Sequence, residues 1–414
     1  MTHMRTFAAA TVAALLATTG AAPAQDGGCA IEGEGSVRIL SNDFEALHRV
    51  GEGALECAGE GVEVTLNQTV EHKTIQVPAL TTDPATYTVA VIANNSIVPL
   101  LGADLLQPLD PYVEKYGANI ADNQLVRLDG GVMAVAFMAN GVHLYYREDL
   151  LEQNGIAVPT TMDEVFAALE TLREAGIEHP FASNYQPGWD LAAEFVNLYL
   201  GTGEDFFVPG SAELAIENES GLRVLETMRR LTEYMRPAFV TDNANTIMPL
   251  WKEGEIAMMF AWGSRAREAL DAEGSETGEL TAVAAMPSMT EGGPPAAALW
   301  WDGFSIARNV SDADAEASFK AMVNALGPDL AAEHGETAVW LTTGYEPAPP
   351  AVGVNANIEA GARSYPMVPY MGILHTALGE NLGEFIQGRE SADQALADIT
   401  QAYETAAREQ GFLQ

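Results

Sequence analysis

The stretch GGVMAVAFMANGVHLYYREDLLEQNGIAVPTTMDEVFAAL, residues 130–169, contains the two patterns that decide the fold. Residues 132–139 form an unbroken apolar run, which is too short to cross a bilayer and matches a strand buried on both faces. The second pattern begins at Thr161, which stands three residues before Glu164 and predicts the capping box of a helix. Apolar residues then recur at helical spacing as far as Gly176, a stop signal. A buried strand followed by an amphipathic helix is typical of an α/β protein.

The same alternation of strands and helices precedes this stretch. In chain order, the predicted elements are a strand at 36–40, a helix at 43–57, a strand at 62–66, a helix through Ile75 and Leu80, and a strand at 87–92. This order predicts a parallel sheet. Later helices begin at the N-cap residues Ser311 and Ser391.

Length and charge restrict the class of protein. The chain has 414 residues, which exceeds one ordinary core and suggests two domains. Its net charge of -38 argues against nucleic acid and anionic membranes as partners, because both would repel it. The acidity is interpreted as a soluble surface suited to a salty medium, and a site that collects cations is the alternative.

The N-terminus has the pattern of an export signal. Arg5 supplies the positive charge, residues 7–19 are apolar or small, and Ala22-Pro23-Ala24 is a small-x-small cleavage pattern. We therefore expect residues 1–24 to be a signal peptide that is cleaved after Ala24, and the mature chain to be periplasmic.

Two cysteines, Cys29 and Cys57, lie in the exported part. An oxidising compartment favours a disulfide between them. A lipid on Cys29 is the alternative, but the residues before it, Asp26-Gly27-Gly28, lack the leucine-small-small pattern of such sites.

Signatures of catalysis are absent from the sequence. It contains no HExxH, no GxSxG, no P-loop and no GxGxxG after a strand. The seven histidines are scattered without metal-ligand spacing. We therefore expect a binding protein without a cofactor or metal, not an enzyme.

Four segments together resemble one family, the sugar-binding proteins of bacterial ABC importers, which are similar to maltose-binding protein. Besides residues 130–169, they are PLWKEGEIAMMFAWG (249–263), WDGFSIARNVSDADAEASFKAMVNAL (301–326) and IQGRESADQALADI (386–399). The chain departs from the family pattern at Tyr146-Arg147, where tyrosine-asparagine is usual. It departs again at residues 41–44, where the family usually has a loop with a tryptophan. These departures leave the identity of the sugar open.

The resemblance implies a two-lobed α/β periplasmic binding protein fold of type II, with lobes joined by a hinge that the chain crosses several times. We expect the N-terminal lobe at 25–139 and 282–345, and the C-terminal lobe at 140–281 and 346–414. Such proteins close around a ligand in the cleft between lobes, as periplasmic binding proteins do by hinge motion. The resemblance further implies a carbohydrate ligand, a membrane permease as partner, and a monomer.

Sugars need planar side chains against their faces and polar groups at their edges. Trp262 follows a predicted strand and is expected to stack on the ligand, with core packing as the alternative. Neighbouring side chains in a strand point opposite ways, so only one of Trp300 and Trp301 can face the cleft. We expect Trp301 to do so, beside Asp302, with Gly303 allowing close approach of the backbone.

Further candidates follow from position and chemistry. Each has a structural alternative: a turn for the asparagines and for the loop at 183–190, a surface or packed role for His72, and pairing with a carboxylate for Arg363. They are Asn42, Asp43 and Phe44 after the first strand, His72 after the second, Asn94 and Asn95 after the third, Asn184, Tyr185 and Trp189 in the loop, and Arg363.

Three other functions stay open. A cationic solute such as a polyamine would suit the acidity, with aromatic walls and carboxylates at the amines. A secreted glycoside hydrolase would use two carboxylates. A sensor or adaptor would keep the fold without transport.

Overall fold

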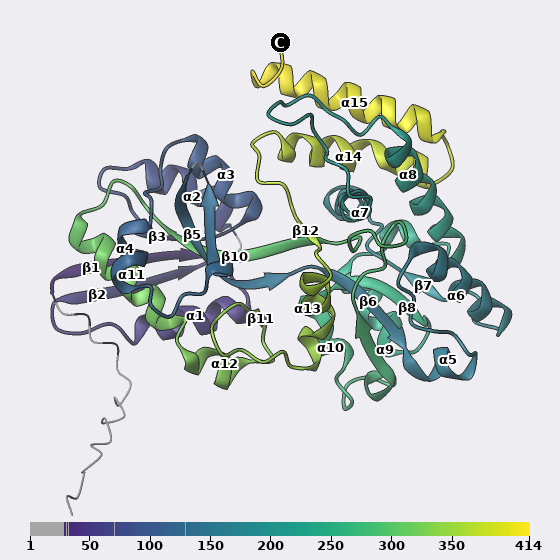
Figure 1. Ribbon diagram of the computed structural model, residues 1–414, viewed down its shortest axis with the longest axis horizontal. Coiled ribbons are helices and arrows are strands. Elements are labelled where there is room, and N and C mark those ends of the chain that lie inside the picture. Colours follow the sequence, from purple (N-terminus) through teal and green to yellow (C-terminus); the bar gives the residue numbers. More distant parts are fainter. Residues whose placement is uncertain (1–28, 30, 32, 70, 129) are drawn as a thin grey trace, which may run out of the picture.

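The computed structural model describes residues 29, 31, 33–69, 71–128 and 130–414 (Figure 1). The expected signal peptide and its cleavage site lie outside these residues. Within the described part, no helix is both long and apolar enough to span a membrane.

The described strands form two sheets, one in each half of the molecule (Figure 1). The larger has the order β11-β5-β10-β3-β1-β2, with β4 paired to β5 and β12 to β10; the smaller has the order β7-β8-β6-β9. The strands of the larger sheet are β1 Gly35–Ser41, β2 Val62–Gln68, β3 Val89–Ala93, β4 Leu125–Leu128, β5 Gly131–Asn140, β10 Ala298–Ile306, β11 Val339–Trp340 and β12 Arg363–Ser364. Those of the smaller sheet are β6 Val142–Arg147, β7 Phe181–Ala182, β8 Met258–Trp262 and β9 Thr281–Ala284.

Helices surround both sheets, and the mixed α/β fold class is confirmed. The pairs β1–β2 and β1–β3 are parallel, as the alternating order predicts, whereas β10 is antiparallel to both β3 and β5. The helices in the half with the larger sheet are α1 Glu45–Leu55, α2 His72–Thr81, α3 Asn94–Gly102, α4 Asp110–Tyr116, α11 Asp312–Ala325 and α12 Pro328–His334. The others are α5 Glu148–Gln153, α6 Met162–Glu174, α7 Trp189–Leu200, α8 Glu219–Leu231, α9 Ala244–Lys252, α10 Ala266–Ala269, α13 Val352–Glu359, α14 Met371–Ile386 and α15 Ala392–Glu409.

Local sequence signals start three of these helices, α6, α11 and α15, at the predicted caps. The side chain of Thr161 accepts a hydrogen bond from the backbone N–H of Glu164 at 3.3 Å, and the Glu164 carboxylate accepts one from the N–H of Thr161 at 3.2 Å, which confirms the capping box of α6. Ser311 caps α11 and Ser391 caps α15 in the same way, through the N–H groups of Asp314 and Gln394.

The predicted buried strand is confirmed in β5, where residues 132–139 are all buried. The larger sheet is covered on both faces. Phe304 and Ile306 of β10 pack into one apolar cluster with α1 and α11, whereas Trp301 packs into another with Leu80 and Ile97. Burial on both faces explains why the strands β3 and β5 read as continuous apolar runs.

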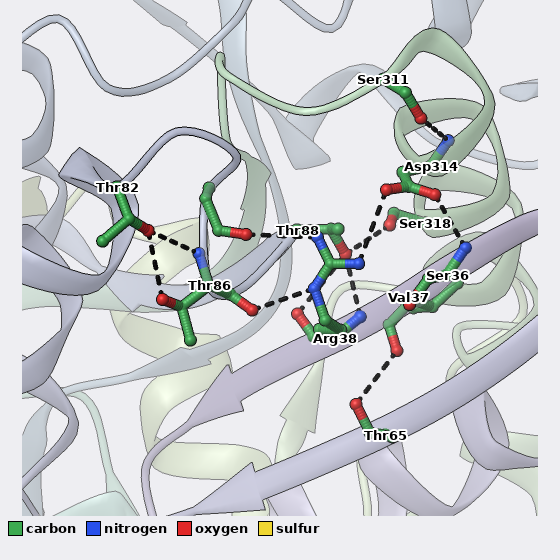
Figure 2. Close-up of polar contacts among 11 residues, drawn as sticks. Ser36, Val37, Arg38, Thr65, Thr82, Thr86, Thr88, Ser311, Asp314 and Ser318 are labelled. Atoms are coloured by element: carbon green, nitrogen blue, oxygen red, sulfur yellow. Dashed lines mark hydrogen bonds and ion pairs between the residues drawn. The ribbon is translucent and has the colours of Figure 1, made fainter.

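A polar network fastens α11 to the beginning of β1 (Figure 2). The Arg38 guanidinium donates to the carbonyls of Thr86 at 2.9 Å and Ala85 at 3.2 Å, and it lies 3.5 Å from the carboxylate of Asp314. The same carboxylate accepts the backbone N–H of Ser36 at 2.8 Å. These bonds stand near the amino end of β1 and leave its carboxyl end free.

The predicted disulfide between Cys29 and Cys57 is confirmed, and it joins the segment before β1 to the residues just after α1. Because both sulfurs are used, a lipid on Cys29 is excluded in this structure.

In the described residues, three connections run between the two sheets, and the chain later returns through β12 to pair with the start of β10. Gly141 alone separates β5 from β6, residues 285–297 connect β9 to β10, and residues 341–351 connect β11 to α13. The lobe boundaries stay a prediction. However, β9 pairs with β6 as far as Ala284, whereas we expected the N-terminal lobe to resume at residue 282.

Candidate functional site

A cavity of about 1340 Å³ lies between the two sheets and is lined by residues from both halves of the molecule. From the larger sheet come the carboxyl ends of β1, β3 and β5 and the first half of β10. From the other half come the end of β8, the start of α7 and the region of α10. Ligands of open α/β sheets bind at the carboxyl ends of strands, so this is the position expected for a binding site.

Three tryptophans, Trp189, Trp262 and Trp300, form one wall of the cavity, which we call the indole wall. The ring centroids of Trp189 and Trp262 are 5.9 Å apart with an interplanar angle of 29°, a stacked arrangement. Trp300 lies 6.0 Å from Trp189 and 6.2 Å from Trp262. Trp189 is 47% exposed, so ring surface is available to a ligand.

Different elements bring the three indoles together. Trp262 is the last residue of β8, and Trp300 lies near the start of β10. Trp189 is the first residue of α7, directly after Gly188, whose φ of 103° is a left-handed conformation that favours glycine.

Four side chains of the half with the larger sheet, which also carries Trp300, form a second lining that we call the polar floor: Asn42, Lys73, Asn95 and Asp302. Asn42 follows β1, Lys73 is the second residue of α2, and Asn95 follows β3. Side-chain Oδ1 of Asn95 is buried and has no hydrogen-bond partner among the described residues. An unpaired buried amide oxygen is costly, so a ligand donor at this position would be stabilising.

The two charges of the polar floor attract each other without forming a bond. Burial raises the pKa of Asp302 to about 7, and the nearby Lys73 opposes this shift. Burial lowers the pKa of Lys73, and Asp302 opposes that shift in turn. Within the described part of the chain, neither side chain forms an ion pair. At neutral pH the Asp302 carboxyl is therefore close to its titration midpoint, and both groups remain available to a ligand.

The mouth of the cavity carries a bridge between the two halves. Nη1 of Arg267 in α10 lies 3.6 Å from Oε1 of Glu45 in α1, and both side chains are more than half exposed. Arg49 also approaches the same carboxylate, at 3.8 Å.

Six of the residues predicted from the sequence line this cavity: Asn42, Phe44, Asn95, Trp189, Trp262 and Asp302. Their roles in ligand binding stay a prediction. The structure places the other candidates away from the cavity.

The orientation expected for the tryptophan pair is wrong. Trp300 lines the cavity, whereas Trp301 is 8% exposed and packs in the core of the larger sheet. The reason is the alternation of a strand, which places Trp300 on the same face as Asp302. Gly303 does not line the cavity. A Cβ there would lie 2.6 Å from the carbonyl oxygen of Val135, so the neighbouring strand β5 requires the glycine.

Three candidates of the larger half have structural contacts instead. Asn94 is fully buried, and its side chain donates to the carbonyl of Leu299 and accepts the N–H of Trp301 at 2.7 Å, so it fixes β10. The carboxylate of Asp43 contacts Nε2 of His48 at 2.6 Å. His72 is buried, so the packed alternative describes it.

The remaining candidates, Asn184, Tyr185 and Arg363, also bind other groups of the protein. Nδ2 of Asn184 donates to the buried carboxylate of Glu194 at 3.1 Å, and the Tyr185 hydroxyl donates to the carbonyl of Met228. Arg363 pairs with the carboxylate of Asp205 and donates to the carbonyl of Glu204, which is the carboxylate-pairing alternative given for it.

Sequence reasoning missed Lys73 and Trp300. Part of the signal for Trp300 was available, because alternation places Trp300 and Asp302 on one face of the strand and Trp301 on the other. For Lys73 the signal was its place at the start of the helix after β2, where we considered only the neighbouring His72.

In the described part of the chain, no group of His, Cys, Asp and Glu residues could hold a metal ion. The cavity instead combines aromatic faces with amide, carboxylate and ammonium groups. This arrangement can bind a small solute with apolar faces and polar edges.

A sequence model of one family, described as bacterial extracellular solute-binding protein, matches residues 41–332. A curated protein of Deinococcus radiodurans, named a probable ABC transporter-binding protein, is 27% identical over 190 residues. That match covers 44% of each chain, so this chain is aligned with less than half the length of its relative.

Solved structures with the same fold cover most of the chain. Maltose-bound MalE3 of T. maritima is 18% identical with a TM-score of 0.70, covering 90% of this chain and 99% of that one. An ABC transporter solute-binding protein of Agrobacterium radiobacter K84 in complex with ribitol gives the same TM-score and coverages at 17% identity. A sugar transporter of Arthrobacter chlorophenolicus A6 with bound laminaribiose does so as well, also at 17%. These likenesses establish the two-lobed fold.

Proposed function

The chain belongs to the bacterial extracellular solute-binding proteins, and from this premise we propose that it binds a carbohydrate, namely a monosaccharide, a short oligosaccharide or a polyol. The ligand would occupy the cavity between the two sheets.

The observation that carries this proposal is that the indole wall and the polar floor line one cavity. Stacked indoles offer flat apolar surface to the C–H faces of a sugar. Asn42, Asn95, Lys73 and Asp302 offer donors and acceptors to hydroxyl groups at its edges. Both surfaces are needed together, because a sugar presents both kinds of group. Proteins of the same fold bind maltose, ribitol and laminaribiose, which supports this ligand class.

We further propose that the chain is exported, cleaved after Ala24 and located in the periplasm, where it acts as a monomer. The ligand would contact both halves and so favour a closed form, because a ligand shifts an equilibrium by its differential affinity for the two states. The closed form would deliver the sugar unchanged to an ABC permease. The family description and the relative named as a transporter-binding protein support this role.

The test is isothermal titration calorimetry of the mature chain with maltose, laminaribiose, ribitol, mannitol and spermidine. We expect saturable heat with at least one of the saccharides or polyols. Mass spectrometry of small molecules that co-purify with the chain would identify the physiological ligand. Heat with spermidine alone would refute the carbohydrate proposal.

A cationic solute is the second candidate, and one observation favours it. Six carboxylates line the cavity against three cationic side chains. They are Glu45, Glu268, Asp271, Glu273, Asp302 and Glu336, against Lys73, Arg265 and Arg267. The carbohydrate remains favoured because Asp302, the carboxylate of the polar floor, has Lys73 beside it, which would repel an amine.

A further inference from the structure

Two buried side chains stand behind the indole wall. The rings of Trp300 and Tyr365 are stacked, with centroids 4.2 Å apart and an interplanar angle of 28°. The imidazole of His375 in α14 lies 5.0 Å from the ring of Trp189. Tyr365 and His375 are 4% and 6% exposed, so the cavity solvent does not reach most of their surface.

Hydrogen bonds connect this second layer in a fixed direction. Nε2 of His375 lies 3.1 Å from the backbone carbonyl of Trp189, and a carbonyl can only accept, so Nε2 carries the proton. Nδ1 of the neutral ring is then an acceptor, and the Tyr365 hydroxyl donates to it at 3.2 Å. Burial lowers the pKa of His375 to about 4, which is consistent with a neutral ring.

The backbone around both residues is also tied down. The N–H of Tyr365 donates to the carbonyl of Leu299, directly before Trp300, at 3.0 Å. The N–H of Gly188, directly before Trp189, donates to the carbonyl of Gly379 in α14 at 3.2 Å. A Cβ at Gly379 would lie 2.7 Å from the carbonyl oxygen of Gly188, so α14 and the loop before α7 are in close contact.

We propose that Tyr365 and His375 act as a pair of positioning residues that fix the spacing of Trp189 and Trp300 before any ligand arrives. The pair spans the two indoles that come from different segments: Tyr365 supports the ring of Trp300, and His375 holds the backbone and the ring of Trp189. Without this support, the half-exposed Trp189 would sample other rotamers, and a ligand would have to immobilise it. The pair therefore preorganises the wall for flat sugar rings more than for acyclic polyols. Its effect on ligand affinity rests on the proposed function, whereas its effect on the indoles does not.

The test uses two substitutions that each keep one half of the imidazole. Nε2 of a glutamine occupies about the same distance from the backbone as Nε2 of histidine, so His375→Gln keeps a donor for the Trp189 carbonyl. His375→Asn keeps an acceptor near Nδ1 for the Tyr365 hydroxyl and loses the bond to Trp189. Both variants lose the ring, but asparagine is smaller than glutamine by one methylene. His375→Met, which is close to glutamine in length and has no donor for the Trp189 carbonyl, is therefore the packing control and should behave like His375→Asn.

The first readout is made on the ligand-free protein, by near-ultraviolet circular dichroism of the indoles and by acrylamide quenching of tryptophan fluorescence. We expect His375→Gln to resemble the wild type and His375→Asn to lose indole dichroism and gain quenching. Tyr365→Phe keeps the stacked ring and the bond from Nε2 of His375 to the Trp189 carbonyl, so it should be altered no more than His375→Gln. Equal behaviour of the two His375 variants, whether both unchanged or both altered, would overturn the proposal, because packing alone would then explain the result.

The second readout is affinity for maltose and for mannitol. For a protein that binds both, we expect His375→Asn to weaken maltose binding about fivefold, the effect of one lost hydrogen bond, and mannitol binding about twofold or less. A larger loss for mannitol than for maltose would overturn the preference for rings. If the wild type binds no sugar while the indole signals change as expected, the carbohydrate proposal fails and the positioning role stands.

Discussion

The two linings of the cavity differ in what they need from a ligand. The rings of the indole wall are held in place without one: they contact each other, and two buried side chains behind them are bonded to each other and to the Trp189 backbone. The wall has one buried polar atom without a partner among the described residues, Nε1 of Trp300. The polar floor is incomplete, since Asp302 and Lys73 form no ion pair and the Asn95 oxygen has no partner among the described residues. A rigid wall supplies affinity at low entropic cost, whereas an unsatisfied floor discriminates between ligands, because a wrong ligand leaves buried polar groups unpaired.

The largest expected effect comes from breaking the wall. Trp262 contacts both other indoles, so Trp262→Ala should remove a stacking surface and loosen its neighbours. We expect a loss of about 2 kcal/mol in binding free energy, or about 30-fold in affinity, measured by calorimetry with the best ligand of the panel.

The matched control for this prediction is Trp251→Phe. Trp251 is fully buried beneath the other side of the smaller sheet and does not line the cavity. It should lower the melting temperature and change affinity less than about twofold. A larger loss of affinity for Trp251→Phe than for Trp262→Ala would mean that general stability, not the wall, determines binding.

The next effect concerns the polar floor. Two aspartates predicted from the sequence, Asp302 and Asp43, are compared as the test residue and its control. Asp302 lines the cavity, whereas Asp43 is bonded to His48 outside it. We expect Asp302→Asn to weaken binding about tenfold, since hydrogen bonds to a charged group contribute about 1.5–3 kcal/mol. It should also change the order of affinities across a panel of epimers.

Asp43→Asn should leave both the affinity and the order of ligands unchanged. If the two asparagine variants behaved alike in the epimer titrations, the polar floor would have no part in selectivity.

The sequence predicts most of the indole wall and most of the polar floor, but it misses Trp300 in the wall and Lys73 in the floor. Local signals, namely apolar runs and capping residues, were enough to predict the strand β5 and the caps of α6, α11 and α15. The family resemblance was also visible in the sequence. Trp262 could be placed at the cavity because it ends a strand and precedes a glycine. None of these predictions depends on which face of a strand meets the cavity and which meets the core.

The orientation of Trp301 and the role of Lys73 could not be derived from such signals. Both faces of β10 are covered by apolar clusters, so the face that continues into the cavity is not marked by polarity. Asn184 and Asn94 have the chemistry of a ligand site, but buried partners, Glu194 and the backbone of β10, use their amides. Whether a buried polar group has a hydrogen-bond partner depends on residues that are distant in the sequence. No local sequence pattern contains this information. The sequence does not distinguish His375 from the other six histidines, and its contact with Trp189 depends on the position of α14 in the fold.

A third prediction concerns the stability of the ligand-free protein. Burial raises the pKa of Asp302 to about 7, above its unfolded value near 3.8, so the folded state holds the proton more tightly. The stability from this group is therefore fully present below about pH 4 and is lost as the pH rises through about 7.

Asp302→Asn removes that loss, so it should raise the melting temperature by a few degrees at pH 8 and leave it nearly unchanged at pH 4. Scanning calorimetry across this range measures the difference, with Asp43→Asn as the control that should show no such trend. A variant that is destabilised equally at both pH values would show that Asp302 is not the group responsible.

The smallest effect is expected at the mouth, where the two halves of the molecule meet through Arg267 and Glu45. Both side chains are more than half exposed, and surface ion pairs contribute about 0–1 kcal/mol. Because this pair joins the two halves, it should stabilise the form in which they lie close together. Arg267→Gln should therefore weaken ligand binding about twofold at low ionic strength.

Salt screens exposed charges, so the difference in affinity between Arg267→Gln and the wild type should vanish at about 1 M salt. Titrations at two salt concentrations measure this, and Glu45→Gln with the double variant completes a cycle that isolates the pair from the neighbouring Arg49. A loss that persists at high salt would show that Arg267 contacts the ligand itself, and the mouth would then belong to the polar floor.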